Sequence, residues 1–245
     1  MFDFSDQNVI VTGGTRGIGR AVAEAFLAAG ATVVASYRGN DEAAHAFKEQ
    51  APASDRLHLA KFDVADYDAV ERFFRDFPEQ HGAPHVLVNN AGIRRDSVLA
   101  MMTQDDWLSV INTNLTGAYN MCKFGVQAMM SERYGRIVNI TSPCGRFGFE
   151  GQANYAASKA GMIGMSRSLS KEVAKRKITV NCVSPGFVET ELIADLPEDL
   201  AKEYKKTVPL KRFAKPDEIA HAVLFLATRE AAYITGATLE VTGGL

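Results

Sequence analysis

The sequence predicts an α/β fold in which a parallel sheet is covered by helices on both faces. Seven short apolar runs rich in β-branched residues alternate with segments of helical pattern. The intervening segments are long enough for the helical crossovers that parallel strands require. The chain has 245 residues, of which 47% are hydrophobic, so a single domain over residues 1–245 can bury a sizeable core.

The strands are expected in chain order at residues 8–11, 32–36, 56–60, 86–88, 136–140, 179–183 and 238–241. A first helix is expected at 21–29, where Gly30 ends the apolar pattern. Later helices should begin at Asp66, at Thr103 with Asp106, and at Lys215-Pro216-Asp217. These sites carry capping residues or a proline suited to the first turn. Open α/β sheets bind ligands at the carboxyl ends of their strands, so the loops after the strands are the places to look for chemistry.

A glycine-rich turn follows the first predicted strand directly. Strand, tight turn and helix in succession form the context that a dinucleotide site requires. Glycine lets the backbone approach a pyrophosphate, and the amides at the helix N-terminus attract its charge. The alternative is a glycine-rich turn without a ligand. The predicted cofactor-binding residues in this turn are Thr12, Gly13, Thr15, Arg16, Gly17, Ile18 and Gly19.

The second predicted strand ends in Tyr37-Arg38, with no carboxylate at its tip. A carboxylate there would bind the ribose 2′-hydroxyl of NADH, whereas an arginine suits a 2′-phosphate. Arg38 and Arg16 therefore predict NADPH/NADP⁺ as the cofactor. As an alternative, both arginines are ordinary surface charges.

Tyr155 and Lys159 are four residues apart in a helical segment, a spacing that places them on one face. An ammonium beside the phenol would bring its pKa down from about 10, and the tyrosine could then act as an acid. Ser142, before a glycine-containing turn, could hydrogen-bond a substrate carbonyl oxygen at the same time. In most helices with this spacing, however, the tyrosine is half-buried and the lysine solvated.

Charge and cysteine content exclude several classes of function. The formal net charge is −2 with no basic stripe, so nucleic acid is not expected as a partner. No apolar run has the roughly 18 residues needed to cross a bilayer, and the N-terminus is not typical of a signal peptide, so a cytoplasmic protein is expected. Cys122, Cys144 and Cys182 have no metal-type spacing and should be thiols. Cys144 could be reactive, but a packing role is favoured.

Taken together, these residues resemble the short-chain dehydrogenase/reductase family over the whole chain. Within it the sequence is most similar to the β-ketoacyl-acyl carrier protein reductases, in the runs 90–96, 151–155, 184–190 and 231–236. The resemblance implies a Rossmann-type sheet with strand order 3-2-1-4-5-6-7. It also implies four catalytic residues, Asn114, Ser142, Tyr155 and Lys159.

The resemblance assigns further residues to the cofactor. Lys159 would bind the nicotinamide ribose and lower the Tyr155 pKa. Asn114 would hold a water for proton resupply, or it could instead only satisfy backbone groups; it is favoured over Asn112, two residues away. Asp63 would meet the adenine, although it could instead cap a helix, and the asparagines at 89 and 90 could instead form a turn. The remaining cofactor residues implied are Val64, Asn90, Ala91, Gly92, Pro185, Gly186, Val188 and Thr190.

The implied reaction is NADPH-dependent reduction of a 3-oxoacyl-[acyl carrier protein] to the 3-hydroxyacyl thioester, in fatty-acid synthesis or in a specialised polyketide or polyene pathway. Arg133 and Arg176 would dock the acidic carrier protein at the mouth of the active site, unless they are merely solvated. Residues 189–210 would form a lid, and Phe147 and Phe149 an apolar wall. Two alternatives are an acetoacetyl-CoA reductase or other alcohol dehydrogenase, and a catalytically silent nucleotide-binding sensor or scaffold.

The resemblance also implies a homotetramer. Two long helices, at about 105–132 and 152–175, would pair across two-fold axes together with the last strand. Small residues on the second helix would permit close approach, or they could instead pack on the sheet; they are Ala156, Ala157, Ala160, Gly161 and Gly164.

Overall fold

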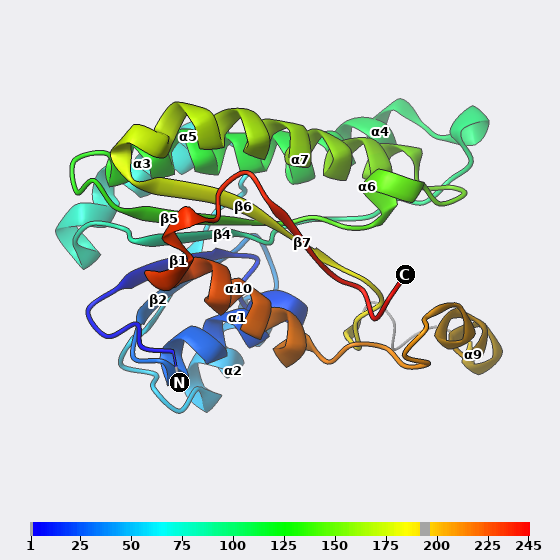
Figure 1. Cartoon of the computed structure of the whole chain (residues 1–245), viewed down its shortest axis with the longest axis horizontal. Helices are drawn as coiled ribbons and strands as arrows, with labels where there is room; N and C mark the ends of the chain where they lie inside the picture. Colours follow the sequence, from blue (N-terminus) through cyan, green and yellow to red (C-terminus); the bar gives the residue numbers. More distant parts are fainter. Residues whose placement is uncertain (1, 192–196) are drawn as a thin grey trace.

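All seven predicted strands join one sheet in the computed structural model, which describes residues 2–191 and 197–245 (Figure 1). Every neighbouring pair is parallel, and the order is β3-β2-β1-β4-β5-β6-β7. The predicted fold class and strand order are therefore confirmed. That the chain forms a single domain stays a prediction, which this one sheet supports. The strands are β1 (Asn8–Thr12), β2 (Thr32–Tyr37), β3 (Leu57–Lys61), β4 (Val86–Asn89), β5 (Gly135–Ile140), β6 (Ile178–Pro185) and β7 (Thr238–Val241).

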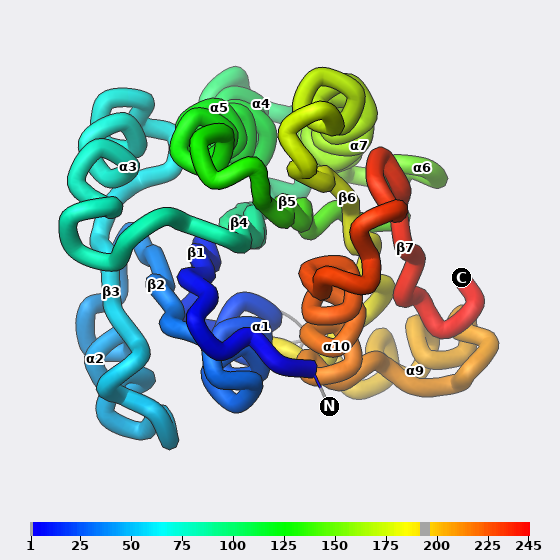
Figure 2. The backbone as a smooth tube through the Cα atoms, turned by 60° about the vertical axis from the view of Figure 1, so that its left-hand side comes forward, coloured from blue at the N-terminus to red at the C-terminus, as the bar shows by residue number. Residues whose placement is uncertain are grey.

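Two helical layers enclose the sheet, as Figures 1 and 2 show. One layer contains α3 (Tyr67–His81), α5 (Gly117–Met129) and α7 (Ala153–Val173), and the other contains α1 (Gly17–Ala28), α2 (Asp41–Gln50) and α10 (Pro216–Ala227). The remaining helical segments are η1 (Leu99–Met101), α4 (Gln104–Ile111), η2 (Asn112–Thr116), α6 (Cys144–Phe147), η3 (Ala174–Arg176), α9 (Glu198–Thr207) and η4 (Glu230–Tyr233).

Side chains of the central strands alternate between two cores, one on each face. In β1, Val9 and Val11 are fully buried with α1 and α10, whereas Ile10 is buried with α3 and α5. This is the period of two that a strand imposes. Each such side chain contributes about 1.5–3 kcal/mol on burial, so the central strands provide a rigid base for the loops at their ends.

The helix starts follow the predicted capping residues. Asp66 accepts a hydrogen bond from the Ala69 amide at 3.0 Å, and Thr103 accepts one from the Asp106 amide at 3.0 Å. Pro216 occupies the first turn of α10, where its missing amide hydrogen costs nothing. All three predicted starts are confirmed.

The first of the two predicted long helices is not continuous. Between α4 and α5, residues Asn112–Thr116 form one π-helical turn. Such a turn inserts an extra residue and changes the direction of the side chains that follow. In this turn Asn114 is completely buried and Asn112 is exposed, so the structure selects Asn114 of the two candidates.

Candidate active site

The carboxyl ends of five strands bring the predicted site residues to one edge of the sheet. The glycine loop follows β1, Asp63 and Val64 follow β3, Asn90 to Gly92 follow β4, Ser142 follows β5 and Gly186 to Thr190 follow β6. Contacts join these loops. A Cβ added to Gly17 would lie 3.5 Å from Thr190 Cγ2, and one added to Gly92 would lie 3.7 Å from Lys159 Nζ.

The glycine loop is shaped by the absence of side chains. Gly13 and Gly17 have φ values of +60° and +52°, which favour glycine. At Gly19 a Cβ would lie 2.1 Å from the Gly13 carbonyl oxygen. The loop can therefore keep this tight path into α1 only with glycine there. This cradle fits the pyrophosphate of a dinucleotide at a helix N-terminus.

Thr12 and Asn90 fasten the glycine loop to the loop after β4. Thr12 Oγ1 accepts hydrogen bonds from the amides of Asn90 and Ala91 at 2.9 and 3.0 Å. In return, Asn90 Nδ2 donates to the carbonyl oxygens of Thr12 and Gly13, both at 3.0 Å. The side-chain amide nitrogen of Asn90 thus holds the glycine loop in place, a role that was not predicted from the sequence.

The adenosine end of the site carries two exposed arginines. Arg38 Nη1 lies 3.3 Å from Asp63 Oδ2, and the Arg38 side chain is 63% exposed. Arg16 directly precedes α1 and is also exposed. Asp63 Oδ1 accepts the Ala65 amide at 2.9 Å, so this carboxylate closes a turn, while Asp66 caps α3. Val64 is buried against Gly117 at the start of α5.

The loop after β6 lines the opposite side of the edge. Pro185 ends β6, and the Gly186 amide donates to the Val241 carbonyl oxygen at 3.0 Å. Gly186 lies so close to Thr242 that an added Cβ would approach its Cα to 2.9 Å. Val188 is buried and pairs with Ala214, which holds Thr190 beside the glycine loop.

Asn114 connects the loop after β4 to α7. Its Oδ1 accepts the Ile93 amide at 2.8 Å, and its Nδ2 donates to the Ile93 carbonyl at 3.0 Å and to Ser158 Oγ at 3.2 Å. The π-helical turn aims the side chain at these partners. Through these bonds Asn114 holds the loop after β4 next to Ser158, the residue that precedes Lys159.

Ser142, Tyr155 and Lys159 lie together at the centre of the edge. Ser142 Oγ accepts a hydrogen bond from the Cys144 amide at 3.2 Å, and the Ser142 side chain acts to lower the pKa of Tyr155. The predicted common helix face is confirmed, since Lys159 Nζ lies 5.6 Å from the centroid of the Tyr155 ring. Lys159 is 3% exposed, and its ammonium donates to the Ile140 carbonyl at 2.8 Å.

The Tyr155 pKa is raised in this structure, not lowered as the sequence predicts. Burial raises the pKa of the Tyr155 phenol to about 12, and the charge that opposes this rise is Arg94, followed by the hydrogen bond from Ser142. Burial likewise lowers the pKa of Lys159 to about 8, since a charged group is disfavoured away from water. The sequence spacing gives proximity but not the solvation of either group.

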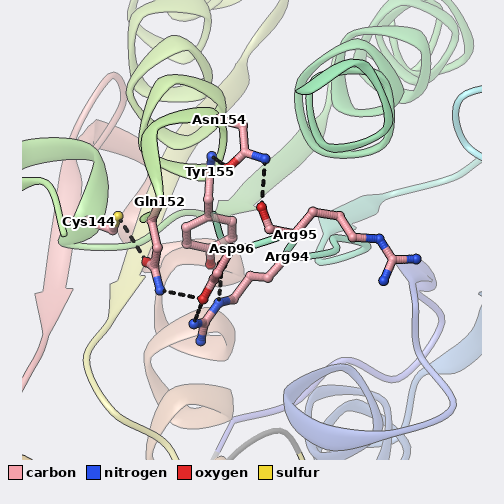
Figure 3. A network of polar contacts seen from close by, with 7 residues as sticks. All are labelled: Arg94, Arg95, Asp96, Cys144, Gln152, Asn154 and Tyr155. Atoms are coloured by element: carbon pink, nitrogen blue, oxygen red, sulfur yellow. Dashed lines mark hydrogen bonds and ion pairs between the residues drawn. The ribbon is translucent and has the colours of Figure 1, made fainter. Parts of the chain in front are cut away.

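Several residues that hold Tyr155 in place were missed from the sequence (Figure 3). Asn154 Oδ1 accepts the Tyr155 amide at 2.7 Å, while its Nδ2 donates to the Arg95 carbonyl at 2.9 Å. Gln152 Nε2 donates to Asp96 Oδ2 at 3.0 Å, and its Oε1 accepts Cys144 Sγ at 3.4 Å. In the sequence, Asp96, Gln152 and Asn154 stood out only as members of the runs 90–96 and 151–155, which carry the family resemblance. Cys144 is buried, and burial raises the pKa of its thiol, which agrees with a packing role.

The structure places Arg133 and Arg176 far from the site of their own chain. Both are exposed and lie just before β5 and β6, at the amino ends of the strands. Arg133 Nη2 lies 3.5 Å from the Lys175 carbonyl oxygen, so the two segments are neighbours. Tyr155 and Arg176 are separated by the 21-residue helix α7, which is about 30 Å long. The expected position at the mouth of the same chain's active site is therefore wrong.

Aromatic side chains form a row between the Ser142 loop and α9. Phe147 and Phe149 are exposed, and the Phe149 ring lies 6.4 Å from that of Phe187. Phe187 in turn stacks on Tyr204 at 5.0 Å. The apolar wall expected from Phe147 and Phe149 therefore extends to α9. Of the predicted lid at 189–210, residues 192–196 lie outside the described part of the chain.

Within residues 2–191 and 197–245, no three His, Cys, Asp or Glu side chains are grouped to hold a metal ion. None of the helices that the structure describes is long and apolar enough to cross a membrane.

The fold and this site define an oxidoreductase that uses a nicotinamide cofactor, and comparison with known proteins gives the family. A family model described as enoyl-(acyl carrier protein) reductase matches residues 13–245. The 3-oxoacyl-[acyl-carrier-protein] reductase of Vibrio harveyi is 45% identical over 96% of both chains. The Escherichia coli (strain K12) protein of that name is 43% identical over 99% of this chain and 98% of its own. The acetoacetyl-CoA reductase of Shinella zoogloeoides is 45% identical over 96% of both chains. The chain therefore belongs to the short-chain dehydrogenase/reductase family.

Proposed function

We propose that this protein reduces a 3-oxoacyl group on acyl carrier protein to the 3-hydroxyacyl thioester, with NADPH as the electron donor. The observation that carries the proposal is that two hydroxyl donors, Ser142 after β5 and Tyr155 beside Lys159 on α7, lie at the same edge of the sheet as the glycine loop. Two such donors can bind one ketone oxygen. The names of the relatives from Vibrio harveyi and Escherichia coli support the choice of substrate.

Each catalytic residue has a role in the proposed reaction. When bound, NADPH supplies a hydride to the ketone carbon. Tyr155 donates its phenolic proton to the oxygen, and Ser142 holds that oxygen by a hydrogen bond while negative charge develops. Lys159 binds the ribose next to the nicotinamide and returns a proton to Tyr155. Asn114 keeps Lys159 and the loop after β4 in register, and a water at this residue completes the path to solvent.

NADPH is preferred over NADH because of Arg16 and Arg38. Arg38 is exposed and its carboxylate partner Asp63 is 3.3 Å away, so the guanidinium can share its charge with a 2′-phosphate. Asp63 and Val64 then lie beside the adenine. Asn90, Ala91 and Gly92 line the adenosine ribose and the path to Lys159. Val188 and Thr190 contact the carboxamide, and the turn at Pro185 and Gly186 positions them.

The acyl chain has an apolar surface to bind. Phe149, Phe187 and Tyr204 present rings in a row from the Ser142 loop to α9. We propose that the carrier protein docks through Arg133 and Arg176 of a neighbouring protomer in a homotetramer. Three free thiols, Cys122, Cys144 and Cys182, fit a cytoplasmic enzyme.

The decisive experiment measures steady-state NADPH oxidation with 3-oxoacyl carrier protein, acetoacetyl-CoA and an enoyl carrier protein thioester. We expect the highest kcat/KM for the 3-oxoacyl carrier protein. Tyr155→Phe should lower kcat at least a hundredfold while NADPH binding stays close to normal, because only the acid is lost. Tyr134→Phe, at the amino ends of the strands, is the matched control. Retained turnover in Tyr155→Phe would rule out the assignment of the acid.

The other outcomes separate the alternatives. Preference for acetoacetyl-CoA would favour a reductase like the Shinella zoogloeoides relative, which is as similar as the Vibrio harveyi one. Preference for the enoyl thioester would agree with the description of the family model. NADPH binding without turnover of any thioester would indicate a silent sensor or scaffold, a reading that the assembled Ser142, Tyr155 and Lys159 disfavour.

A further inference from the structure

Arg94 is a cation at the site for which the proposed mechanism has no role. It lies in the loop after β4, five residues beyond the end of the strand. Its Nε lies 3.3 Å from Asp96 Oδ1, its Nη2 also contacts Asp96 Oδ2, and both side chains are 38% exposed. Figure 3 shows the pair beside the Tyr155 side chain.

The loop that carries Arg94 is fastened to the beginning of α7 by three contacts. The Ser97 amide donates to the Gly151 carbonyl at 2.8 Å, and Gln152 Nε2 donates to Asp96 Oδ2 at 3.0 Å. The completely buried Asn154 joins the Arg95 carbonyl to the Tyr155 amide. Because these bonds hold the three residues that follow Arg94 against the residues that precede Tyr155, the loop that carries Arg94 keeps a fixed position relative to Tyr155.

We propose that Arg94, held by Asp96, is a positioning residue that stabilises the negative charge on the Tyr155 oxygen whenever the proton has left it. This inference rests on the proposed role of Tyr155 as the acid. Lys159 is less suited to the task, since its ammonium already donates to the Ile140 carbonyl at 2.8 Å. Arg94 lies outside the helix, is always charged and has a planar fork that Asp96 can orient.

Other groups near the Tyr155 phenol also change its pKa, and the test must separate their effects from that of Arg94. Burial raises the pKa of Tyr155; Arg94 lowers it most strongly among its neighbours, then the hydrogen bond from Ser142, while Cys144 and Asp96 raise it. Lys159 faces the ring from α7; burial lowers its pKa, and Cys182 opposes this.

The experiment follows the reverse reaction, oxidation of a 3-hydroxyacyl thioester by NADP⁺, in which the Tyr155 phenolate is the base. Below the pKa of that base, kcat/KM rises with pH. Arg94→Gln should shift this rising limb of the pH profile of kcat/KM to higher pH by about half a unit or more. At a fixed pH, kcat/KM should therefore fall by roughly threefold or more. Arg94→Lys should restore most of the loss. Arg95→Gln is the matched control, because Asn154 binds only the Arg95 backbone.

Asp96→Asn distinguishes electrostatics from structure. Removing this negative charge should leave the limb in place or move it to lower pH, whereas loss of a merely structural ion pair would affect Arg94→Gln and Asp96→Asn alike. The inference is overturned if Arg94→Gln coincides with the wild type, or if both variants move the limb upward equally. An active Tyr155→Phe would instead refute the proposed function, so the two failures are distinguishable.

Discussion

Lys159 is a charged side chain that the fold buries, and the free-energy cost of that burial depends on pH. Burial lowers its pKa from 10.5 to about 8. Below pH 8 the lysine is charged in both the folded and the unfolded state, so the whole cost is present. Between pH 8 and 10.5 only the unfolded state binds the proton, and stability rises with pH. The cost is about 3 kcal/mol at most, at 1.36 kcal/mol per pH unit.

Lys159→Met should therefore change the pH dependence of stability. Relative to wild type, the free energy of unfolding of the variant should fall by about 2 kcal/mol or more between pH 7 and pH 10. Urea denaturation of both proteins at several pH values measures this difference. Contributions of other groups cancel between the two curves, and parallel curves would show that Lys159 is not buried as a charge.

At the residue scale, the proposed preference for NADPH depends on Arg38. If Arg38 binds the 2′-phosphate by charge-assisted bonds of about 1.5–3 kcal/mol, Arg38→Ala should raise the Kd for NADPH tenfold or more and leave that for NADH nearly unchanged. Fluorescence titration with both cofactors tests this, with the exposed Arg75 of α3 replaced by alanine as the control. Equal losses for both cofactors would mean that Arg38, with its partner Asp63, only supports the fold.

At the scale of elements, the contact between the end of β1 and the loop after β4 holds the cofactor edge together. Thr12 is 1% exposed and accepts two backbone amides. Thr12→Val keeps the shape but leaves both amides without a partner, at about 1–3 kcal/mol each. We expect a loss of about 2–4 kcal/mol in unfolding free energy, measured by urea denaturation, together with weaker cofactor binding.

Thr12→Ser is the matched control for this contact. It keeps the hydroxyl and loses only a methyl group, so most of the stability should remain. If the serine and valine variants were equally unstable, packing of the methyl group and not the hydrogen bonds would account for the role of Thr12.

At the scale of the whole molecule, the proposed docking role of Arg133 and Arg176 requires that they act at the site of another protomer. Two-fold pairing over α5 and α7 makes these helices antiparallel across the axis. The end of one α7 that carries Arg176 would then lie near the end of the partner's α7 that carries Tyr155. Within one chain the two ends are about 30 Å apart, the length of the helix. Gly164 on α7 is exposed, and a Cβ there would meet nothing within 4 Å, so that position is open to a partner helix.

Replacement of Arg133 and Arg176 by glutamate should raise KM for 3-oxoacyl carrier protein tenfold or more, at least about 1.4 kcal/mol. A short N-acetylcysteamine thioester should be unaffected, and added salt should reduce the difference, because the docking is electrostatic. The control replaces Arg72 and Arg75 of α3 by glutamate. Equal loss for both substrates would point to folding or cofactor binding, and no loss for either would place docking elsewhere.

The tetramer itself is tested by Gly164→Leu. A leucine fits a single chain at this open position but would clash with a helix packed closely across an axis. We expect light scattering to show smaller species for Gly164→Leu, and a tetramer for both the wild type and Gly164→Ala. A wild-type protein that is monomeric at micromolar concentration would contradict the proposed assembly.

Local patterns were sufficient to predict the scaffold and to propose the main site residues. Alternation of Val9, Ile10 and Val11 determines which side chain enters which core, and the glycines after them permit one tight path into α1. The four-residue spacing of Tyr155 and Lys159 fixes their common face. These features depend on backbone geometry over a few residues, so the local residue pattern is enough to predict them.

Interactions between distant segments were decided only by the tertiary structure. The π-helical turn at Asn114, the fastening of Arg94 and Asp96 to α7 by Gln152 and Asn154, and the opposite location of Arg133 and Arg176 depend on which loops meet. So do the pKa values of Tyr155 and Lys159, because solvation is a property of the packed surroundings. The sequence alone determined the fold, the family resemblance and the reacting groups; three-dimensional packing determined which charges those groups experience, since charge and burial act through space and not along the chain.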